Sequence, residues 1–335
     1  MNYNSELDAI LSRWPLGTVF SCSLVPLGDV NRNWLVRTSQ GAYILREISQ
    51  HRTIQDLLFE IKYLEHLKSQ KFPYATPQPV SIDQSQKFVE HEGFYYCIYR
   101  YIEGKVKKQL DLSDLREIAR MVALYHEILE NADLENSASK TPQIAHTFVA
   151  EELAQFKTQI GTKNFKHAHD LKCLEYLDQL SRIHESLHDP SYSKCRTYPI
   201  HRDINPENLI WQEEALVGLI DFENVAIMND TFLKDIGVII QTCCYDRNDP
   251  VQTDLELASN LLKEYESSFS LQLSDLKFLP KILSAGAIED FAYAYWQLIH
   301  DPARADLSRL DFYANVAVWH YQHKDQIVAI LEENH

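Results

Sequence analysis

Three polar residues, Asp203, Asn208 and Asp221, stand at spacings that suit the transfer of a phosphoryl group. The first two are five positions apart in the loop after the apolar residues 198–200, and Asp221 follows a short apolar strand predicted at 216–220. Because this transfer needs positioning and charge neutralisation more than covalent chemistry, we assign Asp203 to the proton of the accepting hydroxyl group. Asn208 and Asp221 carry the oxygen ligands that Mg²⁺ prefers. The pattern therefore predicts a site for Mg²⁺ and ATP.

The loop around Asp203 holds two further residues that fit this chemistry. His201 is expected to brace the loop, and Arg202 adds a positive charge whose target the sequence does not reveal. In the alternative interpretation, the polar residues only satisfy their own backbone and Asp221 caps a strand end. The functional interpretation is favoured because His-x-Asp, the later Asn and Asp-Phe-Glu occur together.

The chain resembles the aminoglycoside phosphotransferase and choline kinase superfamily, relatives of protein kinases that phosphorylate hydroxyl groups of small molecules. The resemblance covers nearly the whole chain and is carried by HRDINPEN at 201–208, LIDFE at 219–223 and KDIG at 234–237. The segments LGDVNRNWLVRTSQGAYILRE and EYESSFSLQLSDLKFLPKIL are similar to the bacterial homoserine-kinase-like branch. By this resemblance Asp235 supports the catalytic loop.

The fold class that the resemblance implies is α+β, a protein-kinase-like fold of two lobes. A small antiparallel β-sheet with one main helix forms the N-lobe at 1–98, a hinge follows at 99–104, and 105–335 form a larger, mostly helical C-lobe. Short alternating segments support the sheet at 19–27, 32–38, 42–48 and 94–102. Helical spacing predicts helices at 4–14, from 112 onward, and near 146–160, 168–188, 231–243, 252–268, 275–299 and 309–332.

The resemblance also suggests residues that bind the nucleotide. The turn with Gly28 and Asn31 is similar to the loop that covers the nucleotide, although its single glycine equally fits a plain hairpin turn. Arg46 stands where related kinases carry a lysine that pairs with the ATP phosphates. An arginine keeps the charge but offers a planar fork, and an exposed arginine at a strand end is the alternative. Backbone recognition of adenine would fall near Arg100 to Ile102.

A helix glutamate is the expected partner of Arg46. The apolar residues of the predicted helix, which place one of its faces on the sheet, are Ile54, Leu57, Leu58, Ile61 and Leu64. Glu60 lies beside this stripe and is favoured as the partner. Glu65 is the competing candidate, and a solvated charge is the alternative for either residue.

The acceptor is expected to bind to the helical lobe, where Asp230, Glu289 and Asp290 offer acidic groups. Homoserine-kinase-like relatives tend to carry an arginine on the matching helix, so the acidic pair argues against homoserine. An amino group or a hydroxyl-rich sugar is favoured instead, although both carboxylates equally fit a solvated helix face.

Composition narrows the class of protein. The net charge of −16 argues against nucleic acid as a partner. No segment approaches the roughly 18 apolar residues of a membrane helix, and the acidic, polar first residues do not indicate a signal peptide. We expect a cytoplasmic protein whose six scattered cysteines are reduced.

The sequence thus predicts an enzyme, a kinase that depends on ATP and Mg²⁺ and acts on a small hydroxyl compound such as an amino alcohol, amino sugar, homoserine-like or aminoglycoside-like acceptor. Two alternatives stay open. A protein kinase is suggested by His201-Arg202-Asp203, against which stand the missing glycine-rich loop and Ala-Pro-Glu segment. A nucleotide-binding scaffold is suggested by Arg46, against which stand the retained Asp203, Asn208 and Asp221.

Overall fold

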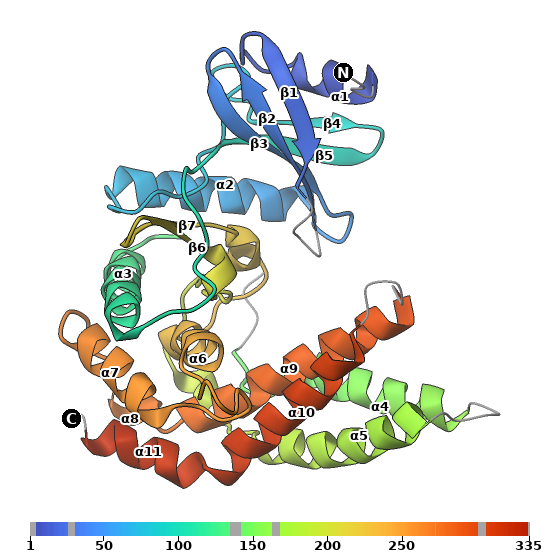
Figure 1. Ribbon diagram of the computed structural model, residues 1–335, viewed down its shortest axis with the longest axis vertical. Coiled ribbons are helices and arrows are strands. Elements are labelled where there is room, and N and C mark those ends of the chain that lie inside the picture. The colour runs from blue at the N-terminus through green and yellow to red at the C-terminus, as the bar shows by residue number, and fades with distance from the viewer. Residues whose placement is uncertain are drawn as a thin grey trace. The chain divides into compact units, whose positions relative to one another are not determined.

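The computed structural model describes residues 5–25, 31–134, 142–162, 168–271, 273–300 and 306–333. The chain forms two compact units, shown with all elements in Figure 1. The first unit consists of Met1–Lys107, Leu134–Asn136 and Glu207–Ile227. The second consists of Lys108–Asp133, Ser137–Pro206 and Met228–His335. Gly28, a predicted nucleotide-binding residue, lies outside the described residues.

An antiparallel sheet forms the centre of the first unit, as the sequence predicted, and it has five strands. Its strands are in the order β1-β2-β3-β5-β4. They are β1 (Val19–Leu24), β2 (Arg32–Thr38), β3 (Gly41–Ile48), β4 (Phe88–His91) and β5 (Phe94–Arg100). The tight turn before β3 uses Gly41 at φ 134°, a conformation open to glycine. Strand β4 was not predicted from the sequence.

Strand alternation gives this sheet two different faces. Leu45 and Ile98 point to a core that includes Ile10 and Trp14, from α1 (Ser5–Leu11) and the residues after it. The next residue along β3, Arg46, must then point to the opposite face. That face receives α2 (Ile54–Ser69), whose first turn is closed by a capping box of Thr53 and Asp56.

Helix α2 buries Leu57, Ile61 and Leu64, as its spacing predicted, but Leu58 is exposed. Glu60, in contrast, is buried. The five apolar residues of the predicted stripe cover more of the helix circumference than the sheet can bury, so the one at its edge stays in solvent.

A two-stranded ladder, β6 (Leu209–Gln212) and β7 (Ala215–Leu219), completes the first unit. Two glycines allow the close approaches that hold it there. A Cβ at Gly104 would lie 2.6 Å from the carbonyl oxygen of Trp211, and one at Gly218 would lie 3.0 Å from that of Ala75. The segment predicted to be the hinge therefore packs directly on the ladder that precedes the Asp-Phe-Glu motif.

The second unit is built of helices. They are α3 (Leu112–Glu130), α4 (Thr147–Gly161), α5 (Ala168–Ser186), α6 (Phe232–Cys243), α7 (Leu255–Glu266), α8 (Leu273–Leu276), α9 (Leu279–His300), α10 (Leu307–Gln322) and α11 (Lys324–Glu333). The single helix predicted at 309–332 is two helices, because the backbone leaves helical geometry at His323. None of the described helices is long and apolar enough to cross a membrane.

Helices α6 and α9 pack closely, and this brings side chains of α6 next to those of α9. A Cβ at Gly237 would lie only 2.9 Å from Ile282, and a Cβ at Gly286 would lie 3.0 Å from the side chain of Gln241. Because larger residues would push the helices apart, these glycines bring one face of α6 onto α9. Lys234 and Gln241 lie on that face, three before and four after Gly237.

Candidate active site

Arg46 is the centre of an ion-pair cluster within the first unit. Its Nη1 lies 3.5 Å from Glu60 Oε1, and its Nη2 lies 3.2 Å from Asp221 Oδ1. The guanidinium also sits over the ring of Tyr99, 5.5 Å from its centroid. Burial alone lowers the pKa of Arg46, but Asp221 and Glu60 outweigh it and raise the pKa above its ordinary value. The arginine is thus held charged and is not a solvated strand end.

Glu60, and not Glu65, is the carboxylate that meets Arg46. Glu60 is 1% exposed and also accepts hydrogen bonds from Arg52 Nη1 at 2.7 Å and from the Tyr99 hydroxyl at 3.3 Å. Glu65 is exposed and pairs with Lys87 instead. Arg52 was missed in the sequence, because an arginine before a helix carries no signal of its target.

We expect Glu60→Gln to lower the free energy of unfolding by about 3 kcal/mol, because two largely buried arginines then face a neutral group. The matched change Glu65→Gln removes only a surface pair and should cost less than about 1 kcal/mol. Urea unfolding of both variants, followed by circular dichroism, measures the difference. Equal destabilisation by the two changes would contradict the central place of Glu60.

The two predicted metal ligands are neighbours at one end of the β6–β7 ladder. Leu209 pairs with Leu219, so Asn208 faces Ile220, whose N–H donates to the Asn208 carbonyl at 3.0 Å. Asp221 follows at once, in a left-handed conformation with φ 67°. Both residues carry hard oxygen donors, and the pair fits the ligand chemistry of Mg²⁺.

Asp221 also keeps an oxygen open to a ligand. Its Oδ1 bonds to Arg46, whereas Oδ2 has no bond to any residue that the structure describes, and the side chain is one-third exposed. Nearby, burial first and then Asp221 raise the pKa of Glu223, which accepts a hydrogen bond from Asn31. Asn31, predicted in the nucleotide-covering turn, thereby contacts the Asp-Phe-Glu segment.

Two residues of the predicted hinge have different surroundings. The side chain of Arg100 is exposed, and its amide donates to Gln78. Ile102 packs against Gly218, 3.2 Å from where a Cβ would stand. Its own N–H and C=O make no hydrogen bond to the described protein. This backbone donor and acceptor are therefore not used within the described residues.

In the second unit, one buried carboxylate holds the loop that was predicted to be catalytic. Asp235 on α6 is fully buried and accepts hydrogen bonds from the backbone N–H of His201 at 3.2 Å and of Arg202 at 2.6 Å. Further along the loop, Asp203 N–H donates to His201 Nδ1, and Asn205 donates to Asp203 Oδ1 at 2.7 Å. Each residue from 201 to 203 therefore has its backbone fixed from within this unit.

Stacked rings connect this loop to the helices. Phe232 lies between Tyr198 and His126, with ring centroids 4.0 Å and 4.1 Å away and nearly parallel planes. His126 is buried and contacts both Asp235 at 3.2 Å and the Tyr265 hydroxyl at 2.7 Å. Burial lowers its pKa despite Asp235. His126 is thus a neutral, fully bonded core residue that orients Asp235.

The predicted acceptor residues all have partners within the second unit. Asp230 accepts from the Tyr192 hydroxyl at 2.5 Å and from Arg202 Nη1 at 3.3 Å. Lys234 lies 3.1 Å from Glu289 Oε2, and Gln241 donates to Asp290 at 2.7 Å. The acidic pair of α9 is therefore matched by α6 rather than free. Lys234 was not among the acceptor residues predicted from the sequence.

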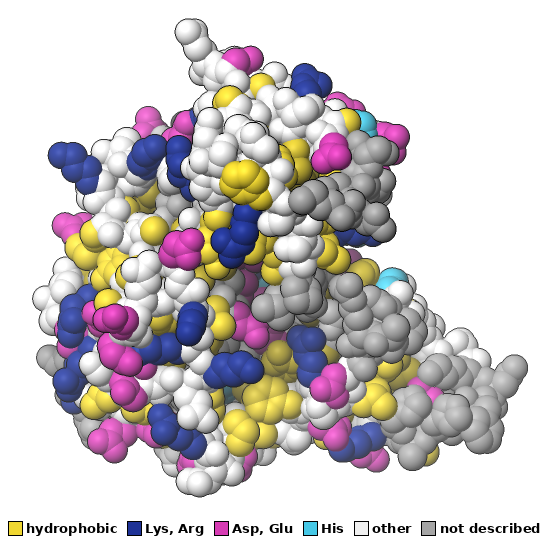
Figure 2. All heavy atoms as spheres, turned by 45° about the horizontal axis from the view of Figure 1, so that its top comes forward, with side chains coloured by type: hydrophobic (Ala, Val, Ile, Leu, Met, Phe, Trp, Pro, Cys, Tyr) yellow, Lys and Arg dark blue, Asp and Glu magenta, His cyan; other side chains and the backbone are white. Residues whose placement is uncertain are grey.

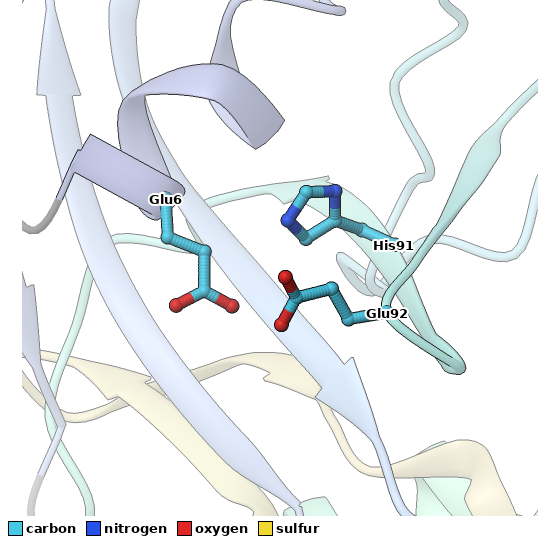
Figure 3. A group of neighbouring side chains, drawn as sticks. All are labelled: Glu6, His91 and Glu92. Carbon is cyan, nitrogen blue, oxygen red and sulfur yellow. The ribbon is translucent and has the colours of Figure 1, made fainter.

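A separate group lies on the outside of the first unit. Glu6 on α1 and His91 and Glu92 at the β4–β5 turn bring their ligand atoms within 4.8 Å of one another, and Figure 3 shows the two carboxylates facing each other. Among the described residues this is the one such group of His, Cys, Asp and Glu. It is open to solvent, where carboxylates gather without an ion, and nothing else marks it as a metal site.

Acidic and basic side chains are interspersed over the face drawn in Figure 2.

Comparison with known proteins shows the family to which the chain belongs. The model of the phosphotransferase enzyme family matches residues 21–267, which is most of the chain, so the chain belongs to that family. The homoserine kinase of Methylobacterium radiotolerans is 27% identical over 287 residues, covering 85% of this chain and 82% of its own.

Two solved structures share the fold. Spectinomycin phosphotransferase in complex with ADP and spectinomycin superposes with a TM-score of 0.71 at 13% identity, covering 97% of this chain and 99% of its own. A microcompartment-associated aminopropanol kinase gives a TM-score of 0.64 at 16% identity, covering 97% of each chain. The kinase-like α+β fold expected from the sequence is confirmed, and the protein is a small-molecule kinase that acts on hydroxyl groups.

Proposed function

We propose that the protein transfers the γ-phosphate of ATP, with Mg²⁺, to the hydroxyl group of a small acceptor. The observation that carries this proposal is the anchoring of the loop on buried Asp235, which holds the backbone N–H groups of His201 and Arg202, directly before Asp203. A carboxylate held this firmly is suited to orient a hydroxyl group and take its proton.

Each residue has one task in this proposal. Asp203 receives the proton of the acceptor hydroxyl, and His201 supports it by accepting the Asp203 N–H. Asn208 and Asp221 would hold Mg²⁺, which neutralises charge on the phosphate oxygens when bound. Arg46, kept charged by Asp221 and Glu60, supplies positive charge for the phosphate oxygens. The backbone of Ile102 serves the adenine ring.

The acceptor is small, and homoserine is its first candidate. The relatives named homoserine kinase support this, and the reason against it weakens in the structure. Glu289 and Asp290 looked like an anionic surface unsuited to a carboxylate, but Lys234 and Gln241 partner them. Because Lys234 offsets the charge of Glu289, the pair repels an acceptor with a negative group less than two free carboxylates would.

Release of ADP with MgATP, measured across homoserine, 3-amino-1-propanol, simple sugars, amino sugars and an aminoglycoside, tests the proposal. Turnover of at least one small alcohol, with its phosphate ester seen by mass spectrometry and loss of turnover on chelation of Mg²⁺, is the expected result. Transfer to protein substrates alone, or binding of nucleotide without any turnover, would reject it.

A further inference from the structure

Arg202 has a backbone conformation that arginine rarely adopts. Its φ is 65°, in the left-handed region where a side chain meets the following carbonyl group. The other described residues of this kind, apart from Asp221, are Lys71, Glu92 and Glu213, and all three stand in exposed turns. Arg202 is half-buried in the catalytic loop. A glycine would take this position without strain, so the arginine is unfavourable here unless its side chain has a use.

The strain is imposed by the loop and not by the side chain. Asp235 accepts the Arg202 N–H at 2.6 Å, and it also accepts the N–H of His201, so the backbone is turned before the side chain makes any contact. The guanidinium contributes one bond, from Nη1 to Asp230 at 3.3 Å. That bond does not require an arginine in a strained loop.

Asp230 sets the direction in which the guanidinium points. The Oδ1 atom of Asp230 is taken by the Tyr192 hydroxyl and the N–H of Thr231, which leaves Oδ2 for Arg202. With Nη1 used in this way, the free edge of the guanidinium is the one formed by Nε and Nη2. Neither atom bonds to a described residue, and the side chain is 11% exposed. This edge has the spacing of a carboxylate.

Two other basic groups near Arg202 are already committed. Lys234 is paired with Glu289 and is 7% exposed. The imidazole of His146 is buried, and burial first, with the positive charges of Lys234 and Arg202, lowers its pKa despite Glu289. It is therefore neutral. Arg202 is the cation here that can still take an anion in two hydrogen bonds.

We propose that Arg202 binds a carboxylate of the acceptor alcohol and so selects carboxylate-bearing alcohols over those that lack this group. The inference rests on the proposed function. Arg202 directly precedes Asp203, the group assigned to the acceptor hydroxyl, whereas the phosphate oxygens are assigned to Arg46. Relatives tend to carry an arginine for the acceptor on the helix that matches α9. In this chain Arg202 of the catalytic loop would take that task.

A pair of acceptors that differ by one group tests the inference. Homoserine and 3-amino-1-propanol share the hydroxyl and the amine, and only homoserine has the carboxylate. For the native protein we expect kcat/KM for homoserine to exceed that for 3-amino-1-propanol by about 10- to 100-fold, the effect of a charge-assisted hydrogen bond. The difference should lie mainly in KM. Arg202→Gly, which also relieves the strained backbone, should bring this ratio close to one.

Matched variants separate recognition from structure. Lys71→Gly removes the same left-handed strain in an exposed turn and should leave the ratio as in the native protein. Arg202→Gln, which keeps a hydrogen-bond donor for Asp230 but loses the charge, should lower the ratio as Gly does and serves if the Gly variant does not fold.

Each outcome has a distinct meaning. Equal loss with both acceptors in the Arg202 variants, or a native preference for 3-amino-1-propanol, would overturn the role of Arg202 and leave the proposed kinase activity intact. Turnover of none of the acceptors by the native protein would overturn the proposed function, and with it this inference.

Discussion

Asp203→Asn is expected to lower kcat by about 10²- to 10⁴-fold, because the amide cannot take the proton of the attacking hydroxyl. Asparagine is nearly the same size as aspartate, and Asn205 can still donate a hydrogen bond to its amide oxygen. The loop should therefore keep its form, since His201 and Arg202 remain bonded to Asp235. The loss belongs to chemistry and not to folding.

Three measurements on Asp203→Asn make this assignment sharp. Steady-state kinetics gives kcat, and saturation with MgATP at about 100 times its dissociation constant should stabilise variant and native protein alike by about 2.7 kcal/mol. Asp178→Asn, an exposed carboxylate on α5 that pairs with Lys157, should keep native kcat. If Asp203→Asn turned over as fast as the control, Asp203 would not be the base.

The sequence was most informative where local patterns decide the contact. The family resemblance implied a partner for Arg46 on the next helix, the helical spacing of α2 favoured Glu60, and the Arg46 and Glu60 side chains lie 3.5 Å apart. The antiparallel sheet followed from short alternating segments. Strand β6 could not be found, since its four residues directly follow the catalytic motif and carry no alternating signal of their own.

Contacts set by helix packing could not be predicted. Glu289 and Asp290 are matched by Lys234 and Gln241 only because Gly237 and Gly286 let α6 approach α9 closely. Nothing in the sequence near residue 289 reveals this. The consequence is chemical, since Lys234 offsets the charge of Glu289 and the argument against a carboxylate-bearing acceptor is weaker than the sequence suggested.

The strained backbone of Arg202 was also hidden. Positions with a left-handed backbone are usually occupied by Gly, Asn or Asp, which makes them recognisable in a sequence. Here the conformation is imposed on an arginine by a carboxylate 33 positions later in the chain. A long-range hydrogen bond of this kind leaves no local signal.

Asp235→Asn should lower the free energy of unfolding by about 3 kcal/mol, because the new amide group turns a donor toward a backbone N–H that is then buried without a partner. Three groups converge on this carboxylate, the N–H of His201, the N–H of Arg202 and the ring of His126. One amide oxygen cannot replace both carboxylate oxygens.

The same change should also slow catalysis, since the left-handed turn at Arg202 is held by its bond to Asp235. Asp254→Asn is the matched control. Asp254 caps α7 by accepting from two backbone N–H groups, a task that Asn performs about as well, so stability and kcat should stay near native. Urea unfolding and steady-state kinetics on both variants decide the point. A destabilised Asp235→Asn protein with native kcat would mean that Asp235 stabilises the fold without positioning Asp203.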